Sequence, residues 1–307
     1  MARRGVTRYI LIVIFGAVSY GMLTSFAKLA YGYGFNPAEI SFGQTLCGAV
    51  VLWTIVVFRK FKNAGFGKVF DWRLVLAGTT MGLTSYIYYL SVSYIDASLA
   101  IVLLMQMTWM SILLEWIFFK KKPSKREIKV VLITLSGTVL ASNLLFANEI
   151  HFSAAGILLA LGAALCFSLF VMATTRIGKQ TPIYEKSALM ATGAVAAVFL
   201  INLNSIVSSP NLNFDLLKWG LFMGMFGIII PPVAFSYGMP KIGVGLSAIL
   251  LTLELPAAVL SAHILLGERI SLLQVAGILV MLGAIAWLNL PKLKGNKQAT
   301  IPGNRTP

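Results

Sequence analysis

The sequence predicts an all-α membrane protein in which ten helices cross the bilayer as two inverted repeats of five. Three observations lead to this fold class. Of the 307 residues, 58% are hydrophobic and 11% are charged, whereas soluble domains carry about 25% charged residues. Long apolar stretches recur along the chain, and the basic residues between them alternate from one loop to the next. The composition excludes a water-soluble globular protein.

A membrane-spanning helix needs about 20 mostly apolar residues. Ten segments approach that length: Tyr9–Ala30, Pro37–Phe58, Leu74–Tyr94, Ala97–Phe119, Lys129–Phe146, Ala154–Thr175, Ala188–Val207, Trp219–Gly238, Val244–Leu266 and Leu272–Leu290. The first is longer than a signal-peptide core of about 7–15 residues, so we expect it to be retained as a helix. The connections are short, and no soluble domain is expected.

The basic residues give the orientation, because cytoplasmic loops attract Lys and Arg. With the N-terminus inside, 22 of the 25 basic residues fall on inner segments, and only Lys28, Lys218 and Arg269 lie on the outer side. We therefore expect a multi-pass protein of the cytoplasmic membrane with both termini in the cytoplasm. Orientation and anionic lipids explain basic residues that are spread over every inner loop, so nucleic-acid binding is not expected.

The chain matches itself when it is shifted by 147 residues. Ala97–Ser124 then lies on Val244–Ser271 with six identities. The loop Lys120–Lys129 has six basic residues, whereas its counterpart around Gly267–Gln274 has one. An odd number of spans in each half makes the second half enter from the opposite side. Inverted repeats are typical of alternating-access transporters, which bind substrate near the midplane.

These repeats divide the chain into three parts. We expect the first five-helix repeat at residues 1–149 and the second at 150–291. Residues 292–307 are rich in Gly, Asn, Gln, Thr and Pro, and they are predicted to form a disordered cytoplasmic tail.

Polar residues at mid-membrane depth are costly in hydrocarbon and mark functional positions. At 1.5 Å per residue, Tyr20, Gln106, Trp109 and Glu254 lie about 13–18 Å along their segments. Each has a structural alternative. Glu254 or Gln106 would equally serve as a hydrogen-bonding group between helices, and Tyr20 or Trp109 as a packing residue.

A polar face is also predicted on the first helix, where Tyr20, Thr24 and Lys28 follow the i, i+4 spacing. Such a face is expected to line a cavity. Lys28 lies near the outer surface, where it snorkels, pairs with Glu39 or serves as an outer gate. Gln44 continues inward the polar face that begins at Glu39.

Two proline sites predict breaks in the second half. Pro256 lacks an N–H and should expose the carbonyl of Thr252 beside Glu254. Pro231-Pro232 lies near mid-depth in the eighth segment. In the third segment we expect one of three tyrosines to line the pathway: Tyr86, Tyr88 or Tyr89.

Three further features are assigned structural roles. Glu115 lies close to Lys120–Lys122, and His263 lies close to Glu268 and Arg269, so surface ion pairs are expected for both. Gly78-x-x-x-Gly82 and Gly220-x-x-x-Gly224 are predicted to let helices pack closely within the monomer.

Membrane-embedded hydrolases are the main rival class. The three aspartates, Asp71, Asp96 and Asp215, all fall in loops, and no H-E-x-x-H motif is present. A Ser247–His263 pair would be separated by roughly 24 Å along one helix, which is too far for a nucleophile and its base. No enzymatic activity, metal site or cofactor is expected.

The second half carries a family resemblance. Leu246–Pro256 followed by Leu265–Ser271 resembles the L-x-P/LLGERLS region of the EamA family in the drug/metabolite transporter superfamily. Tyr20-Gly21 with Lys28 is similar to the W-G…K opening of that family. The chain departs from the pattern where one residue separates Glu254 from Pro256, where Lys120–Lys122 replaces GER, and where Gln44 replaces a frequent arginine.

The resemblance implies a secondary carrier of the cytoplasmic membrane that moves small metabolites, usually outward. It also implies a central cavity within helices 1–4 and 6–9, with helices 5 and 10 at the periphery. Our hypothesis is an amino-acid- or metabolite-like substrate held between Tyr20, Gln44, Gln106, Trp109 and Glu254. Lys28, Glu254 and Pro256 are the candidates for gating or proton coupling. A multidrug exporter, an importer, a passive channel and a membrane sensor are the alternatives.

Overall fold

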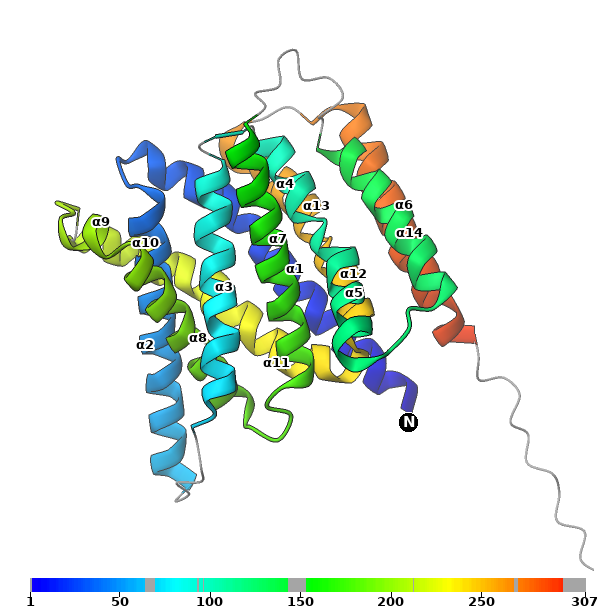
Figure 1. Ribbon diagram of the computed structural model, residues 1–307, viewed down its shortest axis with the longest axis horizontal. Helices are drawn as coiled ribbons and strands as arrows, with labels where there is room; N and C mark the ends of the chain where they lie inside the picture. Colours follow the sequence, from blue (N-terminus) through cyan, green and yellow to red (C-terminus); the bar gives the residue numbers. More distant parts are fainter. Residues whose placement is uncertain are drawn as a thin grey trace, which may run out of the picture.

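The computed structural model describes residues 2–63, 70–92, 94–95, 97–142, 153–211, 213–267 and 270–294, and its elements are helical (Figure 1). They are α1 (Ala2–Gly32), α2 (Pro37–Asn63), α3 (Trp72–Ser91), α4 (Ala97–Leu104), α5 (Met107–Phe119), α6 (Lys125–Ala141), α7 (Ala154–Arg176), α8 (Ile183–Ile201), α9 (Leu203–Val207), α10 (Phe214–Gly224), a π-helical turn (Met225–Ile229), α11 (Ile230–Ile242), α12 (Val244–Leu251), α13 (Glu254–Leu266) and α14 (Leu272–Lys294).

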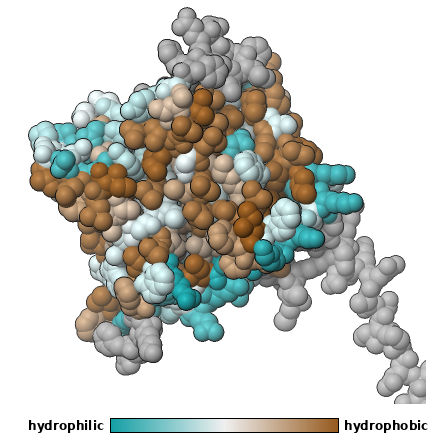
Figure 2. Space-filling model, in the orientation of Figure 1, coloured by the Kyte–Doolittle hydropathy of each residue, from teal (hydrophilic) through white to brown (hydrophobic). Residues whose placement is uncertain are grey.

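These helices form the ten expected segments, because α4 continues into α5, α10 into α11 and α12 into α13. In the described part of the chain, seven stretches are long and apolar enough by themselves to cross a membrane. The segments α3, α6 and α14 complete the ten. Figure 2 shows a broad apolar surface with hydrophilic residues along its lower edge and at its upper left corner. That lower edge, where α1 begins and α5 and α7 end, is called the N-terminal face below (Figure 1).

Helix contacts between the halves repeat in a pattern that fits a pseudo-two-fold axis. The third segment, α3 of the first half, packs against α7 and α8 of the second half. Its counterpart is the eighth segment, in which α11 packs against α1 and α10 packs against α2 of the first half. Equivalent segments also pack on each other as α2 with α8, α5 with α12 and α6 with α14. The α6–α14 pair lies at one side of the bundle (Figure 1), as the family resemblance implied.

Both G-x-x-x-G motifs lie at these interfaces, as predicted. A β-carbon on Gly78 would lie 1.8 Å from the carbonyl oxygen of Met190 in α8. A β-carbon on Gly220 would lie 2.8 Å from the carbonyl oxygen of Gly43 in α2. The two contacts are related by the pseudo-two-fold axis, and close backbone approach is a common way to pack helices in lipid.

Replacing Gly78 with alanine is expected to separate α3 from α8, because the obstructing atom belongs to the backbone. The free energy of unfolding should fall by about 1–3 kcal/mol. The measurement is the midpoint of thermal unfolding in detergent. Gly162→Ala is the matched control, since a β-carbon there meets nothing within 4 Å. Equal midpoints for the two variants would contradict this account of the interface.

The fourth and ninth segments break at equivalent positions. Gln106 N–H donates to Leu103 and Thr108 N–H to Met105, over distances of 3.1 Å. The same three-residue bonds join Leu253 to Leu250 and Leu255 to Thr252, over 3.2 Å. Donor and acceptor numbers in the two sets differ by 147, the shift that relates the repeats.

The break beside Pro256 differs from the predicted one. The Thr252 carbonyl is not left exposed, because it accepts the Leu255 N–H at 3.2 Å. Pro256 lies in the first turn of α13, where a missing backbone donor is tolerated. The first-half break contains no proline. Both breaks have the same three-residue hydrogen bonds, so this backbone geometry does not require a proline.

Pro231 and Pro232 follow the π-helical turn at the start of α11. The wider turn accommodates two residues that lack donors and would clash with a preceding α-helical turn. The Phe226 carbonyl within it accepts a 2.7 Å hydrogen bond from Ser19 Oγ of α1. The turn is therefore fixed against the other repeat.

Three sequence-based assignments fall partly outside the described residues. The helix α14 continues to Lys294, past the predicted start of the tail at residue 292, and residues 295–307 lie outside the description. The end of the fifth predicted segment (143–146) lies outside it too. So do Glu268 and Arg269, the expected neighbours of His263.

Candidate functional site

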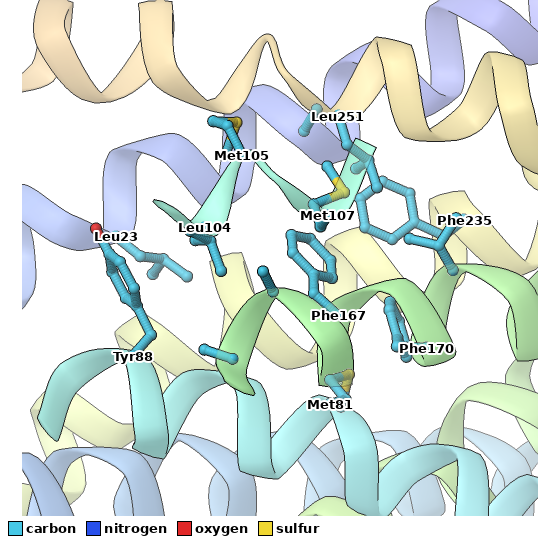
Figure 3. Packing of buried hydrophobic residues seen from close by; sticks show 14 of the residues in the cluster. Leu23, Met81, Tyr88, Leu104, Met105, Met107, Phe167, Phe170, Phe235 and Leu251 are labelled. Carbon is cyan, nitrogen blue, oxygen red and sulfur yellow. The ribbon is translucent and has the colours of Figure 1, made fainter. Parts of the chain in front are cut away.

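A cavity of about 50 Å³ lies where the two repeats meet. It is enclosed by α1, α2, α3, α4, α7, the π-helical turn and α13. Its lining residues are Tyr20, Leu23, Thr24, Gln44, Met81, Thr84, Ser85, Tyr88, Tyr89, Leu104, Phe167, Gly227, Ile228 and Glu254. Figure 3 shows part of the packing around it, with Met105 and Met107 on either side of the break between α4 and α5.

Equivalent residues of the two repeats meet in this cavity. The rings of Tyr20 and Phe167, whose numbers differ by 147, lie 6.1 Å apart at an interplanar angle of 79°. A β-carbon on Gly21 would lie 2.2 Å from the Glu254 carbonyl oxygen. The same shift of 147 residues relates Gly21 to Ser168 and Met107 to Glu254. Ser168 and Met107 are also in contact, through a 3.1 Å hydrogen bond from Ser168 Oγ to the Met107 carbonyl oxygen. The cavity therefore lies close to the pseudo-two-fold axis.

Two buried acceptor atoms belong to residues that line this cavity. Among the described residues, neither Gln44 Oε1 nor Glu254 Oε2 has a hydrogen-bond partner. Gln44 is 1% exposed and Glu254 is 9% exposed. An unsatisfied buried acceptor costs about 1–3 kcal/mol, so such atoms are expected to receive a donor from water or a bound molecule.

The predicted polar face of α1 follows the cavity outward. Tyr20 and Thr24 line the first cavity, and Thr24 and Lys28 line a second one of about 120 Å³. Tyr88 lines both. The second cavity lies between α1, α6, α13 and α14 at the face opposite the N-terminal face. The α1 face that carries Tyr20, Thr24 and Lys28 thus borders one cavity at the centre of the bundle and another at that opposite face.

Gln106 and Trp109 lie apart from the other predicted site residues. Neither lines the central cavity. Trp109 Nε1 donates to Gln106 Oε1 at 2.9 Å, and Gln106 Nε2 donates to the Val102 carbonyl at 3.1 Å. The structure therefore brings together Tyr20, Gln44 and Glu254, while substrate contact by Gln106 and Trp109 stays a prediction.

Two of the three candidate tyrosines, Tyr88 and Tyr89, line the cavity, and Tyr86 does not. Sequence reasoning missed Thr84 and Ser85, which line it from the next turn of α3. A signal for them was present: the polar residues Thr80, Thr84 and Tyr88 recur every four positions. It was hidden because a Thr or Ser commonly bonds its own helix, as Thr84 does to the Thr80 carbonyl at 2.7 Å.

Lys28 does not pair with Glu39, which was one of its expected roles. The Glu39 carboxylate is 1% exposed, and it accepts hydrogen bonds from Asn36 N–H, Ser209 Oγ and Asn211 Nδ2. These bonds cap the start of α2 and join it to the turn after α9. Glu39 therefore has a structural role at the opposite face.

Glu115 is buried, in contrast to the expected surface ion pair. Its side chain is 4% exposed and pairs with Arg176 at the end of α7. The predicted partner Lys121 is also present, with Nζ 3.3 Å from the carboxylate. The sequence did not indicate Arg176, because α5 and α7 come from different repeats.

The comparisons with known proteins identify a family and a fold for this chain. Residues 7–143 and 154–290 each match the EamA-like transporter family. The chain is 23% identical over 239 residues to the threonine/homoserine exporter RhtA of Salmonella typhimurium strain LT2, covering 76% of this chain and 77% of that protein. It is 23% identical over 241 residues to RhtA of Escherichia coli K12, covering 77% and 76%.

A solved crystal structure that is 16% identical has a TM-score of 0.75 over 93% of this chain and 99% of its own. At that identity the likeness shows a shared fold. The family match covers both five-segment halves and therefore most of the chain. An all-helical membrane protein built from two EamA units is a transporter and not an enzyme. This chain belongs to the EamA-like transporter family.

Proposed function

We propose that this transporter is a secondary-active exporter of a small, amine-bearing metabolite that works by alternating access. The N-terminal face would lie in the cytoplasm, with both termini, because 22 of the 25 basic residues then fall on the inner side. The curated relatives are named as exporters. Outward movement is therefore the direction that we propose.

One observation carries the proposed substrate chemistry: Gln44 Oε1 and Glu254 Oε2 are buried acceptors that have no hydrogen-bond partner in the described part of the chain, and their residues line one cavity. A substrate ammonium group would donate to both and pair with the carboxylate. Phe167 and the three lining tyrosines would hold its apolar part. Threonine and homoserine, named for the relatives, both carry such a group, so we propose a substrate of amino-acid size.

The experiment is a substrate panel in everted membrane vesicles and in proteoliposomes that contain the purified chain. Amino acids, simple amines without a carboxylate, and carboxylates without an amine form its three arms. Saturable exchange of an amine-bearing compound between internal and external pools is the expected result. Flux without saturation would indicate a channel, and transport of carboxylates alone would overturn the proposed chemistry.

Gln44→Met is expected to change stability and binding in opposite directions. Methionine has a similar length and removes the unpartnered acceptor, so the unliganded protein should unfold at a higher temperature. The substrate should lose one hydrogen bond, and its half-saturating concentration should rise roughly 3- to 10-fold. Thermal unfolding with and without substrate measures both changes. A weaker affinity without higher stability would mean that Gln44 already has a partner in the unliganded protein.

A further inference from the structure

We propose that Glu115, Arg176 and Lys121 form the gate that closes the N-terminal face of the transporter. In this structure the gate is shut, and it must open before the central cavity can reach that face. The inference rests on the alternating access proposed above. It adds the residues that control one of the two openings.

The carboxylate of the cluster is shielded from solvent, and the cluster joins the two repeats. The Glu115 carboxylate on α5 pairs with the Arg176 guanidinium at the last residue of α7, and their side chains are 4% and 27% exposed. Arg176 also lies over the Phe119 ring, with Cζ 4.8 Å from its centre. Lys121, whose side chain is 49% exposed, adds a second cation at 3.3 Å. A buried carboxylate that pairs with a partly buried guanidinium attracts it more strongly than two exposed groups attract each other.

Among the described residues, the two positions equivalent to Glu115 and Arg176 carry no charged side chain at the opposite face. The shift of 147 residues puts Ala262 where Glu115 stands and Leu29 where Arg176 stands. Ala262 lines the second cavity of about 120 Å³ together with Lys28, whereas Leu29 lines a different one. The two equivalent positions thus differ in charge, and at the charged one the Glu115 side chain is only 4% exposed. We attribute the closure of the N-terminal face to the ion-pair cluster.

The backbone provides a hinge on one side of the cluster and a fixed end on the other. The segment α5 begins directly after the break at Met105 and Gln106, so it can tilt without α4. The end of α7 is held by Lys186 Nζ, which donates to the carbonyls of Thr174 at 2.6 Å and Ile177 at 2.7 Å. Opening is therefore expected to move α5 away from α7.

A cysteine-accessibility experiment tests the gate without any substrate. In a background with Cys47 and Cys166 replaced by alanine, Ser111→Cys is the reporter. Ser111 is buried on α5, one turn from Glu115. Glu115→Gln and Arg176→Gln should each raise its labelling by an impermeant maleimide from the N-terminal face roughly tenfold, since hydrogen bonds to charged groups are strong. Glu115→Arg combined with Arg176→Glu and Lys121→Glu reverses every charge of the cluster and should return labelling toward the original rate.

A second reporter and a control separate gating from general loosening. Ala262→Cys, in the opposite cavity, should be labelled more slowly when the gate is weakened, because alternating access opens one face at a time. Lys218→Gln breaks the exposed pair with Asp215 and should change neither rate. Unchanged labelling of Ser111→Cys, faster labelling at both reporters, or no recovery in the charge swap would each overturn the gate. Saturable substrate exchange by the unmodified chain would leave the proposed function standing in all three cases.

Discussion

Glu254→Gln is expected to abolish substrate accumulation driven by a pH gradient while it preserves exchange of substrate across the membrane. The amide keeps the shape of the carboxyl group and one acceptor oxygen, so exchange should persist at a higher half-saturating substrate concentration, but the amide cannot bind and release a proton. Glu254 is the acidic residue that lines the central cavity, and a carboxyl group at this depth is a functional position by default. Proteoliposomes with and without an imposed pH gradient would show the difference.

Glu254→Leu should impair both activities. Loss of a charged hydrogen bond, worth about 1.5–3 kcal/mol, raises the half-saturating substrate concentration roughly 10- to 100-fold. Glu185→Gln is the matched control, because it removes a carboxylate that pairs with Lys60 at 3.5 Å and does not line the cavity. A pH dependence that Glu254→Gln leaves unchanged would remove Glu254 from proton coupling and leave it as a substrate contact.

The fold class was predictable because the membrane limits the choice of structures. Backbone groups in hydrocarbon must bond within their own segment, so each long apolar stretch becomes a helix. The glycine pairs at Gly78 and Gly220 predicted close packing correctly for the same reason, since small residues let backbones approach. The segment ends shifted by several residues where polar caps intervened, as at Ser124, whose capping box starts α6 before the apolar run.

The site residues were predictable only where their depth in the membrane or their spacing along a helix identified them. Tyr20, Gln44 and Glu254 were selected by depth or helical spacing, and all three line the cavity. The same depth selected Gln106 and Trp109, but depth does not say toward which neighbour a side chain points, and these two bond to each other. Spacing along one chain likewise did not indicate the Glu115–Arg176 pair, which forms when the repeats pack together.

Gly21→Val is expected to have the second large effect, because Gly21 positions Glu254. A β-carbon at Gly21 would lie 2.2 Å from the Glu254 carbonyl oxygen and 2.6 Å from Ala257 Cβ. The start of α13 must therefore move away from α1, and the Glu254 carboxyl group moves with it. A displacement of about 1 Å at a working site lowers rates roughly 100-fold. Substrate exchange in proteoliposomes measures that loss.

Gly32→Val is the control within the same helix, since a β-carbon there meets nothing within 4 Å. Thermal unfolding of both variants separates misfolding from displacement. A folded Gly21→Val protein without exchange would show that the α1–α13 contact sets the position of Glu254. If that protein exchanged substrate at the normal rate, Glu254 would have to tolerate movement, and the cavity seen here would not define the binding geometry.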